Sequence, residues 1–140
     1  MAGSLNSSVP AREFGYGAVQ TLRKRITYLN NGTTITVGKL PPYAVVVGGG
    51  VHIVTAFNDS GTDLLDVGFI GSTTDADAYG TVMTLAAVGF IVLDELAATT
   101  NIMGTVEHTV TCLYTGQNSN ATAGDAYVIV NYVTAYPAVA

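Results

Sequence analysis

From Val19 onward, apolar and polar residues mostly alternate along the chain, which is the pattern of β-strands with one buried face. The segment MGTVEHTVTCLYTG shows it most clearly. Its apolar face carries Val106, His108, Val110, Cys112 and Tyr114. The opposite face is mostly polar, so this segment predicts a half-buried strand.

A second segment, AYVIVNYV from Ala126, is almost continuously apolar and β-branched, which is typical of a strand covered on both faces. About seven or eight such strands, separated by turn signals, favour an all-β fold over an α/β one. We therefore predict a single-domain antiparallel β-sandwich, jelly-roll-like, over residues 19–140. Residues 1–18 lack periodicity and predict an extended N-terminal arm.

Local signals predict the connections between the strands. Asn31-Gly32 separates two β-rich runs and predicts a hairpin with a type I′ turn. Gly48-Gly49-Gly50 is followed by a β-rich run and lacks the spacing of a phosphate-binding loop, so a bend or bulge between two strands is expected. Residues 81–100 mix helical and β-branched residues and leave room for one helical turn.

Charge is sparse and unevenly distributed. Only 11% of residues are charged, against about 25% in ordinary soluble domains, which indicates that another chain covers part of the surface. All five cations lie at or before Lys39, and nine of the ten acids follow Phe57. This asymmetry predicts either a basic arm that docks on an acidic partner or a merely solvated strand face.

The same charge and hydropathy patterns exclude some partners. The net charge of −5 makes nucleic acid a poor one, since phosphate neutralisation supplies most of that affinity. No apolar run reaches the ~20 residues of a membrane span, and the N-terminus does not resemble a signal peptide. A soluble protein that is not exported by the standard route is expected.

The chain offers few candidates for catalysis. His108 and Cys112 share a face but stand about 13 Å apart along an extended strand, too far for a Cys-His dyad. His52 remains free to approach either of them from another strand. Cys112 is the single cysteine, so no internal disulfide is expected, and no short metal-ligand spacing occurs. We predict no enzyme and no cofactor, with Cys112 in the core.

The stretch GSTTDADAYG, residues 71–80, places two carboxylates two positions apart. An EF-hand does not fit, because Tyr79 and Ala86 stand where oxygen ligands are needed. A looser calcium site at Asp75 and Asp77 is the alternative. A glycosidase pair lacks support, since the chain has no tryptophan platform. The favoured interpretation is a structural turn, with Tyr79 anchoring the next segment.

Three stretches carry a resemblance: TAFNDSGTDLLDVGFIGSTTDADAYG at residues 55–80, then AAVGF, then ATAGDAYVIVNYV. Together they resemble small tailed-bacteriophage virion proteins, over about residues 40–134. The chain departs from the family pattern at Phe69-Ile70, where a small residue and an immediate turn are expected. The resemblance implies a capsid cement or decoration protein that sits as trimers on the outer surface of an icosahedral head.

The resulting hypothesis is a structural virion protein, made in the host cytoplasm, whose partner is the major capsid protein. The candidate capsid-contact residues lie in the arm and the strand after it: Arg12, Phe14, Tyr16, Arg23, Lys24 and Arg25. The alternative is an exposed adhesin or carbohydrate-binding module that uses Tyr43 and Tyr79 with the Asp75/Asp77 loop. A head-fibre or tail subunit is a variant of the same structural hypothesis.

Overall fold

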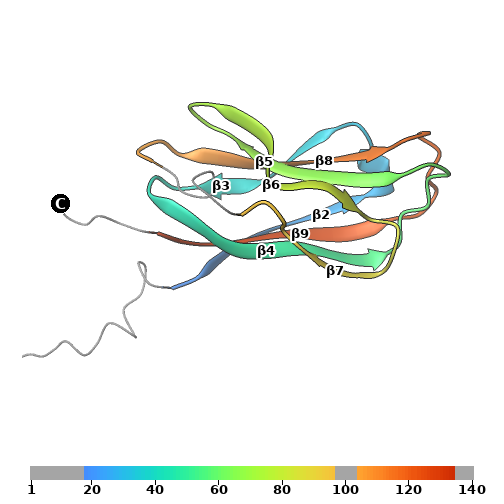
Figure 1. Cartoon of the computed structure of the whole chain (residues 1–140), viewed down its shortest axis with the longest axis horizontal. Coiled ribbons are helices and arrows are strands. Elements are labelled where there is room, and N and C mark those ends of the chain that lie inside the picture. Colours follow the sequence, from blue (N-terminus) through green and yellow to red (C-terminus); the bar gives the residue numbers. More distant parts are fainter. Residues whose placement is uncertain (1–17, 97–103, 135–140) are drawn as a thin grey trace, which may run out of the picture.

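A computed structural model describes residues 18–96 and 104–134 as two packed antiparallel sheets (Figure 1). The first sheet has the order β2-β9-β4-β7: Gln20–Thr27, Asp125–Thr134, Ala44–Thr55 and Gly89–Val92. The second has the order β3-β8-β5-β6: Thr34–Leu40, His108–Gly116, Asp63–Ile70 and Thr74–Thr84. The chain changes sheet at every connection except β5–β6, which is a jelly-roll topology. The predicted all-β sandwich is confirmed.

The core lies between the two sheets and follows the alternation of the sequence. The inward side chains of β8 and β9 are buried: His108, Val110, Cys112 and Tyr114, then Ala126, Val128, Val130 and Tyr132. Val106 stands before β8 begins and is exposed. Strand β9 lies between β2 and β4 at the centre of its sheet, and its outward residues are half-buried, so one of its faces is fully covered and the other only partly.

The predicted hairpin at Asn31-Gly32 is wrong, because β2 pairs with β9 and β3 pairs with β8 in the other sheet. A short 3-10 helix, η3 (Tyr28–Asn30), follows β2 and redirects the chain. Asn31 (φ −54°, ψ 129°) and Gly32 (φ 76°) then form a type II turn closed by Thr33 N–H donating to the Asn30 carbonyl at 3.0 Å. Both strands exist, but their partners are distant in sequence.

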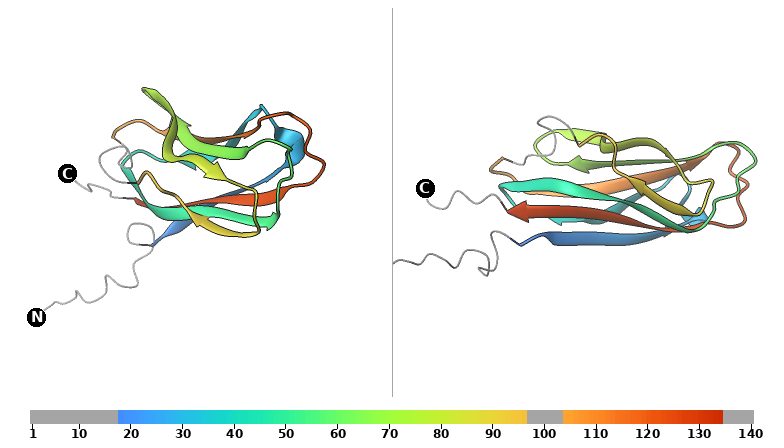
Figure 2. Two further views of the ribbon diagram at one scale, coloured as in Figure 1. Left: turned by 45° about the vertical axis from the view of Figure 1, so that its right-hand side comes forward. Right: turned by 60° about the horizontal axis from the view of Figure 1, so that its bottom comes forward.

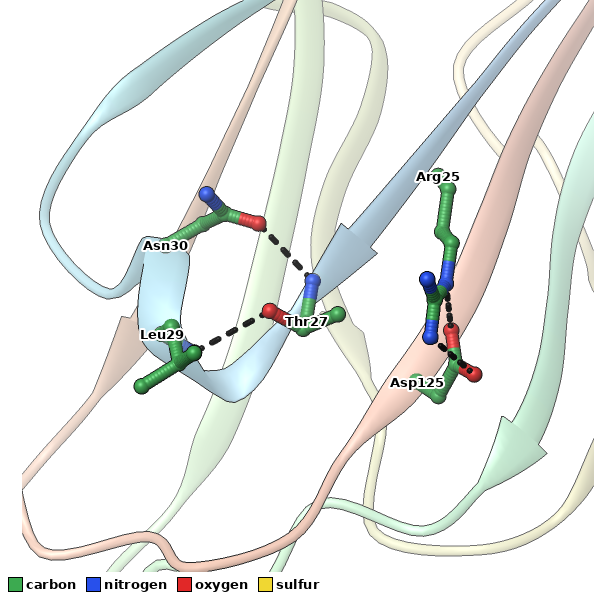
Figure 3. A network of polar contacts seen from close by, with 5 residues as sticks. All are labelled: Arg25, Thr27, Leu29, Asn30 and Asp125. Atoms are coloured by element: carbon green, nitrogen blue, oxygen red, sulfur yellow. Dashed lines mark hydrogen bonds and ion pairs between the residues drawn. The ribbon is translucent and has the colours of Figure 1, made fainter.

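Thr27 is the residue that starts this redirection (Figure 3). Its hydroxyl accepts the N–H of Leu29 at 3.3 Å, and its own N–H donates to the Asn30 side chain at 2.8 Å. This reciprocal capping box satisfies two backbone donors at the helix start. The strand therefore ends at a capped turn and does not fold back on itself.

Two further local predictions need correction. Gly48–Gly50 lies within the single strand β4, where the pairing with β9 shifts between Val46 and Gly48, so the glycines mark a bulge and not the boundary between two strands. The expected helical turn does not occur in the described part of residues 81–100, where β6 ends and β7 follows. Across the described ranges, no helix is long and apolar enough to cross a membrane.

One end of the sandwich, on the right in Figure 1, is held by a buried polar network between the β4–β5 and β8–β9 loops. Asp59 accepts N–H groups of Gly61, Asn118 and Asn120 at 2.7–3.0 Å. Asp63 accepts the Tyr114 hydroxyl at 2.6 Å and the N–H of Asp59 at 3.1 Å. Because each carboxylate has several donors, the two loops are locked together although both aspartates are buried.

The charge of Asp59 is set by these donors. Burial would raise the pKa of Asp59, but the N–H groups of Gly61, Asn118 and Asn120 together hold it below its ordinary value. A lowered pKa in the folded state means that the carboxylate stabilises the fold above about pH 4, the pKa of an unfolded aspartate, and that this contribution is lost as pH falls through the folded pKa.

We therefore expect Asp59→Asn to lower the melting temperature at pH 7 and to have a shrinking effect below pH 4, where the wild-type carboxyl is itself protonated. Circular dichroism melts from pH 7 to pH 2 measure the difference. Thr62→Ser, at an exposed position of the same loop, is the control for a loop change that alters no charge. An equal difference at both ends of the pH range would contradict the role given to the Asp59 charge.

Candidate interaction surface

The stretch GSTTDADAYG forms a turn and then a wide bulge in β6. Phe69 pairs with Asp75 and Val67 pairs with Gly80, so residues 76–79 span a place where β5 supplies only Gly68. A Cβ on Gly68 would collide with the backbone of Asp75 and Ala76. Only a glycine at position 68 lets the β6 bulge pack this closely against β5.

Tyr79 anchors the bulge from below. Its side chain has no exposed surface, and its ring centroid lies 5.8 Å from that of Phe69. Tyr79 therefore cannot contribute to the adhesin surface predicted with Tyr43 and the acidic loop, because a buried side chain cannot contact a glycan. Tyr43 itself is exposed.

The two carboxylates of the bulge have partners within the chain. Asp75 accepts the N–H of Asp77 at 3.4 Å, and Asp77 accepts the Thr81 hydroxyl at 3.3 Å. Within residues 18–96 and 104–134, no group of three or more His, Cys, Asp or Glu side chains is placed to hold a metal ion. The calcium site at Asp75 and Asp77 stays a prediction from the sequence.

The candidate nucleophile and bases do not form a reactive pair. Cys112 and His108 are buried on the inner face of β8, whereas His52 is exposed on β4 in the other sheet. Burial raises the pKa of Cys112 to about 12, with Lys24 acting in the opposite direction, and burial lowers the pKa of His108. The thiol is thus protonated at neutral pH, and the prediction of a core cysteine is confirmed.

Of the six candidate contact residues, three lie in the described chain. Arg23, Lys24 and Arg25 follow one another on β2, an edge strand of the first sheet. Arg12, Phe14 and Tyr16 lie outside the described residues, as does nearly all of the predicted arm.

The three cations of β2 differ in their surroundings. Arg25 makes two hydrogen bonds to Asp125, at 2.8 and 3.0 Å (Figure 3), which hold the pKa of that carboxyl below its ordinary value. The Arg23 guanidinium lies 4.1 Å from the Tyr127 ring centroid. Lys24 shares the inward register of Leu22 and Ile26 yet is exposed at the open edge. Arg25 is thus neutralised, whereas Arg23 and Lys24 present positive charge.

Opposite charges collect on the two lateral margins of the sandwich. We call the margin formed by β2 and β3 the basic edge; it carries Arg23, Lys24, Arg25 and Lys39. We call the margin formed by residues 74–95, which include β6 and β7, the acidic edge; it carries Asp75, Asp77, Asp94 and Glu95. Figure 2 shows β2 and β7 on opposite sides of β9 and β4 (right view).

The acidic edge also exposes large apolar side chains, which the sequence analysis missed. Their exposed fractions are 57% for Val82, 67% for Val88, 56% for Phe90 and 63% for Val92. Outward apolar residues gathered at one margin mark an interaction surface more often than scattered ones do. The available sequence signal was the low charge content, which indicated a covered surface but not its location.

Three solved structures share this fold. A chain from the acid-stable capsid of Helicobacter pylori bacteriophage KHP30 matches with a TM-score of 0.65 and 19% identity, covering 86% of this chain and 91% of that one. A chain of the cyanophage Pam1 capsid matches at 0.66 and 20%, covering 92% and 93%. A chain of the Ralstonia phage GP4 capsid matches at 0.63 and 19%, covering 87% and 88%.

These likenesses extend over almost the whole of each chain, so the jelly roll with its connections is shared and not merely a common core. At this level of identity they establish the fold. No protein-family model and no curated protein sequence matches the chain. The predicted similarity to phage capsid proteins is therefore confirmed at the level of three-dimensional structure.

Gly68→Ala is expected to destabilise the fold by about 1–3 kcal/mol, because its methyl group would push the β6 bulge away from β5. Urea denaturation followed by circular dichroism measures the change in the free energy of unfolding. Gly48→Ala is the matched control, since a Cβ there meets no atom within 4 Å. Equal losses at the two positions would show that the close contact at Gly68 is not the cause.

Cys112 should react with a thiol reagent such as DTNB only when the protein opens, because its sulfur is buried and protonated. We expect negligible labelling at pH 8 in native buffer and one equivalent in concentrated urea, as befits a single cysteine. A Val106→Cys variant, whose added thiol is exposed, serves as the reactive control. Rapid labelling of the folded wild type would contradict a core position.

Proposed function

We propose that this chain is a structural protein of a tailed-bacteriophage virion, a cement or decoration protein that binds the outer surface of the icosahedral head as a trimer. The observation that carries the proposal is the match of the whole jelly roll, over 86–92% of this chain, to chains from three phage capsids. The resemblance of residues 55–80 and 121–133 to small virion proteins supports the same assignment.

The proposed activity is mechanical and needs no reactive group. A cement protein stabilises a shell by contacting several neighbouring capsid subunits at once. Separating those subunits then also requires breaking their interfaces with the cement protein. Stable interfaces bury roughly 1,200–2,000 Å² of total surface. The sparse charge of the sequence indicates surface of the kind that such burial requires.

The major capsid protein is the proposed partner, and the arm is the proposed anchor. Arg12, Phe14 and Tyr16 combine charge with aromatic area, the residue types enriched at the centre of interfaces. An extended arm can add a strand to a neighbouring sheet, and its single cation, Arg12, favours an acidic site on the shell. The protein would be made in the host cytoplasm and end on the outer face of the virion.

The full-length chain is expected to co-sediment with shells assembled from its cognate major capsid protein and to raise the temperature at which they rupture. Deleting residues 1–18 should abolish co-sedimentation and leave cooperative unfolding intact, because β2 begins after the deletion. Replacing Arg12, Phe14 and Tyr16 together by Ala should reproduce the loss, whereas Ser7→Ala should not.

Different outcomes would refute the anchoring role of the arm and the cement function. Undiminished binding by the truncated chain would refute the anchoring role of the arm only. A folded full-length chain that neither binds the shell nor protects it from heat would refute the cement function itself.

A further inference from the structure

We infer that copies of this chain associate head to tail, with the basic edge of one copy against the acidic edge of the next. The inference deepens the proposed function, on which its biological setting rests, by assigning the surface through which the copies contact one another. It is carried by three independent features of the described residues: uncompensated charge, exposed apolar area and unpaired strand margins.

Charge on the two edges is complementary and only partly compensated within the chain. No Lys or Arg follows Lys39, so the acidic edge draws no ion pair from the residues near it in sequence. The ion pairs among the described residues join Arg25 to Asp125 and Lys39 to Glu107, at 2.8 and 3.4 Å. Arg23 and Lys24 on one edge are left facing solvent, as are Asp77 and Glu95 on the other.

The acidic edge combines this charge with the apolar side chains of Val82, Val88, Phe90 and Val92. Exposed ion pairs each contribute only about 0–1 kcal/mol. Apolar burial contributes about 25 cal/mol per Å², so these side chains would supply most of the affinity. On the basic edge, Val19 and Leu29 are also exposed, at 59% and 76%. The charges then fix which edges meet and in which orientation.

Strand pairing leaves the same two margins available. In the described chain β7 pairs with β4 alone and β2 with β9 alone, so each strand has one unpaired side. The edge of β7 offers only four residues and that of β2 offers eight. Backbone groups on both margins are therefore free to take part in the contact.

A two-fold contact between identical edges is disfavoured, because it would bring Arg23 and Lys24 of both copies together, or Asp77 and Glu95 of both copies. Contact between unlike edges is heterologous, and a heterologous contact that closes on itself forms a ring. The trimer proposed above is a ring of this kind. The occupant of the acidic edge is thus a second copy of this chain.

Charge reversal of the full-length protein tests the inference. We expect Arg23→Glu with Lys24→Glu, or Asp77→Lys with Glu95→Lys, to raise the dissociation constant of the oligomer at least tenfold, measured by sedimentation velocity. Combining all four substitutions restores opposite charges across the contact and should restore self-association. The combined variant should also fail to mix with wild-type chains, because each mixed contact would join like charges.

A matched pair of variants tests how much the exposed apolar side chains contribute to self-association. Val92→Ser, on the acidic edge, should weaken the oligomer, whereas Val106→Ser, exposed to 46% and outside both edges, should leave it unchanged. Melting curves of every variant establish that the fold is retained, so a change in mass reports on association.

A wild-type chain that stays monomeric, a combined variant that stays monomeric while folded, or single-edge reversals that leave the mass unchanged would each overturn the inference. Shell binding is read separately by co-sedimentation. A monomer that still binds the shell would overturn the edge contact and leave the cement function standing, and an oligomer that does not bind would do the reverse.

Discussion

The whole structure depends on the dry packing of two sheets against each other. Tyr79, Tyr114, Leu65 and Val128 are almost fully buried between them, and every strand contributes its inward residues to this layer. Because the layer excludes water, groups that titrate elsewhere become inert here: the Cys112 thiol holds its proton and His108 resists gaining one. Because Cys112 and His108 are buried in this layer, the outer surface of the sandwich is what a partner can contact.

The packing of the two sheets also makes the ends of the sandwich different from its lateral margins. One end of the sandwich contains buried carboxylates, Asp59 and Asp63, whose donors come from both loops at that end, so this end is fixed. The lateral margins are different, because a sandwich of open sheets cannot pair its outermost strands internally. Arg23 and Lys24 line one margin, and Phe90 and Val92 line the other. The buried end of the sandwich is thus held by internal contacts, whereas the lateral margins keep strand edges available for contacts with another chain.

The sequence allowed the strands to be predicted wherever alternation was strong, as in His108–Gly116 and Asp125–Thr134. It did not allow their partners to be predicted, because Arg23 pairs with Ile129 and no local pattern encodes that distance. Asn31-Gly32 can form the turn of a hairpin within one sheet or the turn of a connection between two sheets. The capped 3-10 helix before it is the feature that directs the chain into the other sheet. The bulge of β6 escaped prediction similarly, since it depends on a glycine in the neighbouring strand. Exposure of Phe90 follows from β7 lying at a margin, which the topology alone decides.

The start of β2 and the end of β9 lie side by side, with Gln20 opposite Tyr132 at the same end of the sandwich. A tensile force applied between these two residues would therefore act across the strands and not along them. It would open the β2–β9 ladder one pair at a time, beginning at Gln20. Resistance of that kind is low, since hydrogen bonds broken in sequence do not share the force. A protein of this fold that resists mechanical load would therefore need to take the force through the lateral margins of the sandwich, where many contacts break together.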